Sequence, residues 1–120
     1  MRFALIAFTL AFTVACGDKD TGTDSGGGDS GDSNSEVDAI LALTGDATAG
    51  GTTFANTCAA CHGADGASGY AANLVEEIPE KDDAFIVNII INGDGGGMPA
   101  QDLSDQEVAD VLAYVRATFG

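Results

Sequence analysis

The chain has 120 residues, enough for one small domain, and its 19 acidic residues against 4 lysines and arginines give a formal net charge of −15 at pH 7. Phosphate recognition depends on lysine and arginine, so this charge argues against nucleic-acid binding and against a direct patch for anionic lipids. It leaves two interpretations open, which are a solvated acidic surface and electrostatic steering toward a basic partner.

The first 15 residues have the layout of a signal peptide. Arg2 supplies a positive charge, a mostly apolar run follows from Phe3 to Val14, and a small residue, Ala15, comes next. The run is too short to span a bilayer as a mature helix. A buried N-terminal helix is the alternative, but the polar residues that follow could not pack against it. Residues 1–15 are therefore predicted to be an export signal.

Cys16 directly follows this run and is the odd cysteine of three. Its surroundings resemble the lipid-attachment site of bacterial lipoproteins, although Thr13 stands where those sites usually have Leu. We expect lipidation of Cys16 to hold the exported protein on the periplasmic side of a bacterial membrane. Ordinary cleavage after Ala15 is the alternative.

Residues 16–36 are predicted to comprise this anchor cysteine and a disordered linker, because they are rich in Gly, Ser and Asp and contain no large apolar residue. The folded domain is predicted to occupy residues 37–120. Its first segment, residues 37–43, is apolar and is expected to be a helical preface with no assigned function.

The first main helix is predicted from Ala47 to Asn56. Asp46 is a suitable N-cap, and Gly50 and Phe54 lie four residues apart on one face.

The next five residues, Cys58-Ala59-Ala60-Cys61-His62, read C-x-x-C-H. Two thiols at this spacing can form thioethers with the two vinyl groups of one haem, and the adjacent histidine then lies against the iron as an axial ligand. The pattern is the attachment signature of c-type haem. His62 is the only histidine in the chain, so ligation by two histidines of one chain is impossible.

The second main helix is predicted from Lys81 to Asn92, with Asp82 or Asp83 as its cap and Gly93 as its stop. Its β-branched residues would also suit a strand. The helical spacing of its apolar residues favours a helix, and these residues are Phe85, Ile86, Ile89 and Ile90.

Met98 is the candidate second axial ligand, since Met1 is removed with the export signal and no other methionine remains. It lies in the loop Gly95-Gly96-Gly97-Met98-Pro99, where glycines let the backbone pass close to a haem and proline stiffens it. Histidine and methionine together raise the reduction potential of haem iron. The alternative is a methionine that fills a gap in the core.

The third main helix begins at a capping box, Ser104 to Glu107. Apolar residues then recur at helical spacing, with Tyr114 on the packed side: Val108, Val111, Leu112 and Val115. The three helices make a thin core for a domain of this size, which a covalently held haem would reinforce.

Together these features resemble the small class I cytochromes c over about residues 45–119. The residues that carry the resemblance are Gly45-Asp46-Ala47, Gly50, Phe54, Cys58 to Gly63, Asn73-Leu74, Asn92-Gly93, Met98-Pro99 and Leu103 to Tyr114. The resemblance implies an all-α cytochrome c fold, with three main helices wrapped around one covalent haem c and with Gly50 approaching Tyr114. In one departure, Ala72 replaces a proline that is frequent in the family and whose carbonyl accepts the Nδ1–H of the axial histidine. Any residue's carbonyl can do this.

The expected function is one-electron transfer in a periplasmic or membrane-tethered respiratory chain, with a basic redox protein as partner. The protein is expected to be an electron carrier and not an enzyme, although it could be the electron-transfer subunit of an oxidoreductase. One alternative is a haem enzyme or gas sensor in which Met98 is displaceable. Another is a thiol-redox or zinc protein, but the βαβ setting of the former and a fourth ligand for the latter are lacking.

Overall fold

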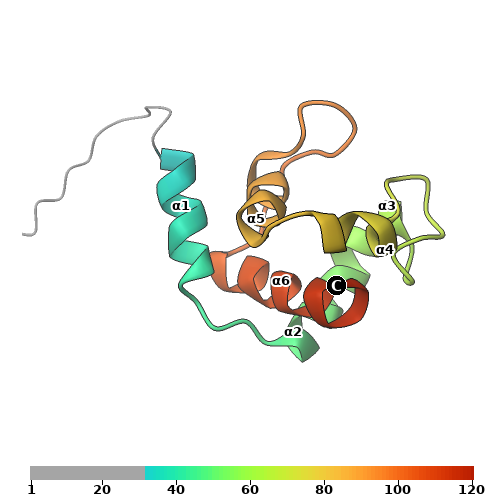
Figure 1. Cartoon of the computed structure of the whole chain (residues 1–120), viewed down its shortest axis with the longest axis horizontal. Coiled ribbons are helices and arrows are strands. Elements are labelled where there is room, and N and C mark those ends of the chain that lie inside the picture. Colours follow the sequence, from blue (N-terminus) through green and yellow to red (C-terminus); the bar gives the residue numbers. More distant parts are fainter. Residues whose placement is uncertain (1–31) are drawn as a thin grey trace, which may run out of the picture.

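The computed structural model describes residues 32–120, so the predicted export signal, Cys16 and most of the predicted linker lie outside the described residues. The predicted all-α class is confirmed, since residues 32–120 contain helices and turns and no β-strand (Figure 1). No helix in that range combines the length and apolarity needed to span a bilayer. The α-helices are α1 (Asp32–Leu41), α2 (Ala47–Thr53), α3 (Ala59–His62), α4 (Leu74–Glu77), α5 (Asp83–Asn92) and α6 (Asp105–Phe119).

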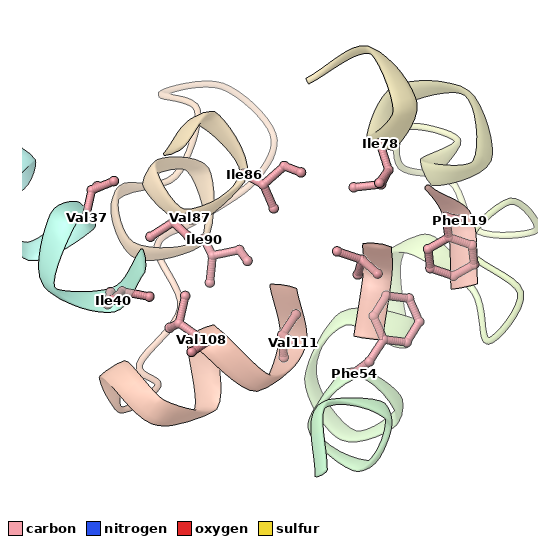
Figure 2. Packing of buried hydrophobic residues seen from close by; sticks show 12 residues of the cluster. Val37, Ile40, Phe54, Ile78, Ile86, Val87, Ile90, Val108, Val111 and Phe119 are labelled. Carbon is pink, nitrogen blue, oxygen red and sulfur yellow. The ribbon is translucent and has the colours of Figure 1, made fainter. Parts of the chain in front are cut away.

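Helix α1 starts inside the predicted linker, because residues 32–36 form its first turns. The sequence indicated an apolar segment only from residue 37 onward. Asp, Ser and Asn are favoured at helix starts, and the buried side chains of Val37 and Ile40 give the helix a packed face. Figure 2 shows both side chains directed toward α5 and α6. The helical preface expected at residues 37–43 is therefore present, but it begins five residues earlier and ends two residues earlier than predicted.

Helices α2 and α6 pack closely across each other (Figure 1). The Asp46 carboxylate caps α2 by accepting from the N–H groups of Thr48 and Ala49 at 2.8 and 3.2 Å, as predicted. Gly50 is buried at the crossing, where a Cβ atom would collide with the backbone carbonyl of Asp110. The buried Asp110 carboxylate accepts from the Asp46 N–H at 2.8 Å and so also fixes the start of α2.

The helical path does not end at Asn56, because a π-helical turn, Phe54–Cys58, joins α2 to α3. A π turn places one extra residue in the helix and so changes which face the following side chains occupy. Phe54 remains in the core, where its ring centroid lies 5.2 Å from that of Tyr114 and 5.7 Å from that of Phe119. Cys58, at the end of the turn, packs partly buried against the same core.

Helix α5 begins at Asp83, two residues later than predicted, and its cap is Asp82, which accepts from the Phe85 N–H at 2.7 Å. It ends at Asn92 and is capped by Gly93, whose φ of 74° lies in the left-handed region. Its predicted apolar stripe is only partly buried, since Phe85 is 44% exposed. Val87, outside the predicted stripe, is fully buried because α1 covers that side of α5.

Helix α6 confirms the predicted capping box, with Ser104 and Glu107 bonded to each other's backbone N–H groups. Its buried residues join those of α1 and α5, together with Phe54 of the π-helical turn and Ile78, in one core (Figure 2). The core members on α6 are Val108, Ala109, Val111, Val115 and Phe119.

Candidate functional site

A cavity of about 470 Å³ lies between α3, α5, α6 and the loops on either side of α5. Its size is typical of sites for large organic ligands. Most of its wall is apolar and comes from Phe54, Ile78, Phe85, Ile86, Ile89, Ile90, Val111 and Val115. The apolar stripe predicted on α5 is thus largely a cavity wall, which explains the exposure of Phe85.

Four residues singled out in the sequence also line this cavity, and they are Cys58, Cys61, His62 and Met98. Cys58 ends the π-helical turn, Cys61 and His62 lie in α3, and Met98 comes from the loop after α5. The structure therefore brings together donors that lie up to forty positions apart in the chain.

The imidazole of His62 is buried, and its Nδ1 lies 2.9 Å from the carbonyl oxygen of Ala72. The bond expected at this departure from the family pattern is confirmed. Because a carbonyl only accepts, Nδ1 donates its proton in this bond, and in the neutral imidazole the lone pair is then on Nε2. Such a bond fixes the tautomer and the ring orientation of a metal-binding histidine.

Cys58 and Cys61 are both free thiols and both are half-buried. Burial, reinforced by the neighbouring Cys61, raises the pKa of the Cys58 thiol to about 11. A thiol-redox catalyst needs the thiolate at neutral pH, so this environment does not suit that alternative. The Sγ of Cys61 lies 2.9 Å from the hydroxyl oxygen of Tyr70, whose side chain is largely exposed.

The loop that carries Met98 is organised by Asp94. One oxygen of its carboxylate, Oδ1, accepts from the backbone N–H of Gly96 at 2.8 Å and from that of Met98 at 3.0 Å. The Asp94 N–H in turn donates to the Met98 carbonyl at 3.1 Å. Because the backbone N–H groups of Gly96 and Met98 stabilise the charged carboxylate, the pKa of Asp94 lies below its usual value.

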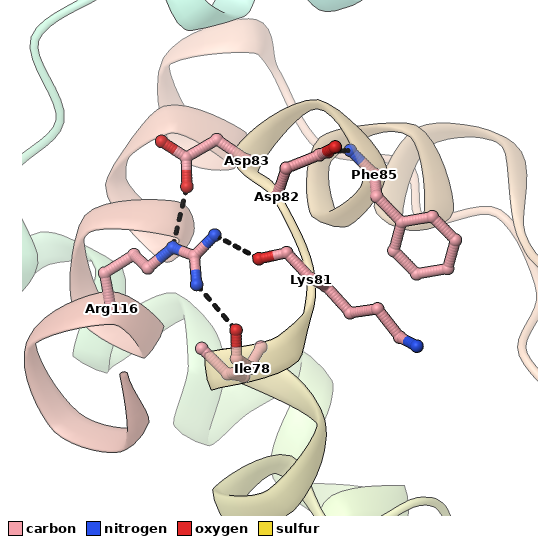
Figure 3. Close-up of polar contacts among 6 residues, drawn as sticks. All are labelled: Ile78, Lys81, Asp82, Asp83, Phe85 and Arg116. Carbon is pink, nitrogen blue, oxygen red and sulfur yellow. Dashed lines mark hydrogen bonds and ion pairs between the residues drawn. The ribbon is translucent and has the colours of Figure 1, made fainter.

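Arg116 of α6 bonds to the segment that joins α4 to α5 (Figure 3). Its guanidinium donates to the carbonyl oxygens of Ile78 and Lys81, both at 2.6 Å, and its Nε lies 2.7 Å from the Asp83 carboxylate. The segment that it holds joins α4 to α5, and both Ile78 and Lys81 line the cavity.

Asp94, Tyr70 and Arg116 were not identified as site residues from the sequence. The Asp-Gly-Gly run at Asp94 is a signal that could have been used, because aspartate before glycines often accepts from nearby backbone N–H groups. Nothing comparable marks Tyr70 or Arg116, whose partners lie nine to thirty-eight positions away.

These residues fit a haem. The cavity offers an apolar wall for the ring, an imidazole and a thioether for the iron, and two free thiols beside the histidine. Within residues 32–120, no group of three or more His, Cys, Asp and Glu side chains is arranged to hold a bare metal ion. The zinc alternative has no structural support there.

Comparisons with known proteins agree with this chemistry. The model of a family described as cytochrome c oxidase, cbb3-type, subunit III, matches residues 45–115. A cytochrome c-553-like protein of a Synechocystis species is 33% identical over 81 residues, which cover 67% of this chain and 76% of that protein. No solved structure shows a significant match. The family match begins after α1, so this helix lies outside the matched region.

Proposed function

The chain belongs to the cytochrome c family whose model includes subunit III of cbb3-type oxidases, and on that premise we propose that it is a one-electron carrier with one covalent haem c. In this proposal Cys58 and Cys61 form the two thioethers, and His62 and Met98 are the axial ligands. The observation that carries the proposal is the convergence of all four side chains on a single apolar cavity.

Each residue has a distinct role in this arrangement. The Ala72 carbonyl holds His62 with its Nε2 lone pair available to iron. Met98 offers a neutral thioether from the loop after α5, and the apolar residues of α5 and α6 keep water away from the ring. A bound haem supplies a reversible one-electron couple at its iron, whose potential a histidine–methionine pair raises. If His62 and Met98 both held the iron, no substrate would have access to it, and the chemistry supplied at this site would be electron transfer alone.

The partner and the location are part of the same proposal. The acidic composition suits a redox protein with a basic docking surface. Electron transfer to a basic partner should slow as ionic strength rises, whereas transfer to an acidic partner should become faster. Stopped-flow rates measured with both kinds of redox protein over a salt series test this expectation. The opposite salt dependence would contradict the assignment of the partner.

We further propose that residues 1–15 direct export and that a lipid on Cys16 holds the protein at the periplasmic face of a membrane, within a respiratory chain. The full chain, expressed in a bacterium that matures c-type cytochromes, should fractionate with membranes and require detergent for release. The Cys16→Ala variant should appear in the soluble periplasmic fraction. Equal partitioning of the two proteins would count against lipidation.

An absorption spectrum of the matured protein tests the haem ligands. A low-spin spectrum, a weak far-red sulfur-to-iron band in the ferric state, and no response to carbon monoxide are expected. Met98→Ala should lose the far-red band and bind carbon monoxide. Ile89→Ala is a matched control, because Ile89 lines the cavity without offering a donor atom and its variant should remain closed. A wild-type protein that binds carbon monoxide would favour a haem enzyme or gas sensor with a displaceable Met98.

Covalent attachment has a separate test. Intact-protein mass spectrometry should show one haem retained after acidified-acetone extraction of the wild type. The double variant Cys58→Ala, Cys61→Ala should release its haem under the same extraction. Retention of haem by the double variant would refute the two thioethers.

A further inference from the structure

The loop that carries Met98 has little packing of its own. Gly95, Gly96 and Gly97 are exposed, and a Cβ atom added to Gly95 or Gly97 would meet no atom within 4 Å. Glycines lose more backbone freedom on ordering than other residues. A stable position for Met98 therefore requires hydrogen bonds that offset this loss.

Asp94 supplies such bonds at both ends of the Met98 residue. Its carboxylate accepts from the Met98 N–H at 3.0 Å, and its own N–H donates to the Met98 carbonyl at 3.1 Å. The same carboxylate oxygen holds Gly96 N–H at 2.8 Å. Charge-assisted bonds of this kind are stronger than those between neutral groups.

The far end of the loop is tied to α5 independently. The Gln101 N–H donates to the Ile90 carbonyl at 2.8 Å, and the Gln101 side-chain amide donates to the Pro99 carbonyl at 2.7 Å. The loop is thus anchored after Met98 by Gln101 and before it by Asp94. Between these anchors, only Asp94 reaches across the glycines to bond the Met98 N–H among residues 32–120.

We propose that Asp94 is a positioning residue, whose carboxylate holds the backbone of Met98 where the thioether faces the iron. This inference rests on the proposed function, since it takes Met98 to be an axial ligand. Loss of the carboxylate would leave Met98 held by the backbone bond to its carbonyl and by the Gln101 anchor, so the glycine loop would be more mobile and the fraction of molecules with an open sixth position would rise. An external ligand would then compete more effectively with the thioether.

The test is a titration of the ferric, haem-loaded full chain with imidazole, in which binding is monitored as the loss of the far-red absorption band. Asp94→Ala removes the two side-chain bonds but keeps the backbone bond to the Met98 carbonyl. Its apparent affinity for imidazole should rise about tenfold. Asp94→Asn keeps an acceptor oxygen without the charge, so its affinity should lie between those of the wild type and Asp94→Ala.

Asp102→Ala is the matched control. Asp102 is an exposed carboxylate four positions beyond Met98 and forms no hydrogen bond with any residue of the described range. Its variant removes the same charge without touching the loop, and its imidazole affinity should equal that of the wild type. If Asp94→Ala and Asp102→Ala behave alike, the effect is one of charge or is absent, and the positioning role is overturned.

Failure of this inference can be told apart from failure of the proposed function. If Asp94→Ala binds imidazole like the wild type while Met98→Ala binds it far more tightly, Met98 is a ligand and Asp94 does not position it. If the wild type itself lacks the far-red band and binds carbon monoxide like Met98→Ala, the ligand assignment falls and the role of Asp94 falls with it.

The bond between Asp94 and the Met98 N–H can also be tested in the wild-type protein, without a variant that could fail to fold. Amide hydrogen exchange of the ferrous protein should show the Met98 N–H protected relative to the Gly95 N–H, for which the structure gives no acceptor in residues 32–120. Exchange at the same rate at both sites would mean that the Asp94 bond is not formed, and would overturn the proposal.

Discussion

The crossing of α2 and α6 is expected to tolerate no side chain at Gly50. In the variant Gly50→Ala, the new Cβ would collide with the Asp110 backbone carbonyl and lie 2.9 Å from the Cβ of Tyr114. Neither atom can move without shifting α6. The two helices would therefore have to separate.

The magnitude follows from two opposing effects. Alanine in place of glycine inside a helix stabilises by about 0.5–1 kcal/mol, whereas overpacking a tight contact costs about 1–3 kcal/mol. Because the clash is with a backbone atom, the overpacking cost should lie in the upper part of its range, about 2–3 kcal/mol, and the net loss in the free energy of unfolding should be about 1–2.5 kcal/mol. For a domain of this size, each kcal/mol lowers Tm by about 4–8 °C.

Gly51→Ala provides the comparison within the same helix. Its Cβ would lie 3.1 Å from atoms of the Tyr114 ring, with no backbone atom as close. The ring can turn away, so this variant should stay within about 1 kcal/mol of the wild type. Guanidinium unfolding of the haem-loaded proteins, followed by far-ultraviolet circular dichroism, measures both values. Equal stabilities for Gly50→Ala and Gly51→Ala would refute the reasoning.

Three further outcomes are expected. Arg116→Met should lower the free energy of unfolding by about 2 kcal/mol, because the carbonyls of Ile78 and Lys81 lose their donors. Arg116→Lys should be equally destabilised, since lysine lacks the planar guanidinium that reaches both carbonyls, and a clear difference in Tm between the two variants would contradict this. Ile40→Ala should lower the free energy of unfolding by about 2–5 kcal/mol, because Ile40 is buried, whereas Leu41→Ala should lower it much less, because Leu41 is 36% exposed. Similar denaturation midpoints for the two variants would show that α1 is not packed on the domain. The pKa of Asp65 should lie below 3.8, because the Ala67 N–H and the Ser68 side chain and N–H donate to its carboxylate. The stabilisation by this carboxylate is present above the unfolded pKa and is lost as pH falls through the lower folded pKa. An NMR titration midpoint at or above 3.8 would contradict this prediction.

Local chemistry in the sequence was enough to predict several features of this protein. The caps at Asp46 and Ser104 were predicted correctly, and Asp82 was one of the two candidates for the cap of α5, because a capping side chain bonds the backbone two or three residues away. The pentad that ends at His62 was recognisable for the same reason, since both thiols and the imidazole lie within five consecutive residues.

Other features depend on contacts between distant segments, and these were decided by the tertiary structure. Val87 is buried because α1 covers it, and the linker-like residues before Val37 are helical because that helix has a surface to pack on. Burial of this kind depends on which element lies opposite, and the periodicity of a single helix does not specify its neighbour.

The candidate site shows the same division. From the sequence alone, Cys58, Cys61, His62 and Met98 could be named by their chemistry, because donor type and spacing are local properties. Only the tertiary structure shows that they line one cavity, with Arg116 holding the wall between α4 and α5. The physical reason is that the residue type alone determines which atom can act as a ligand, whereas the distance between ligands depends on how helices far apart in the chain pack together.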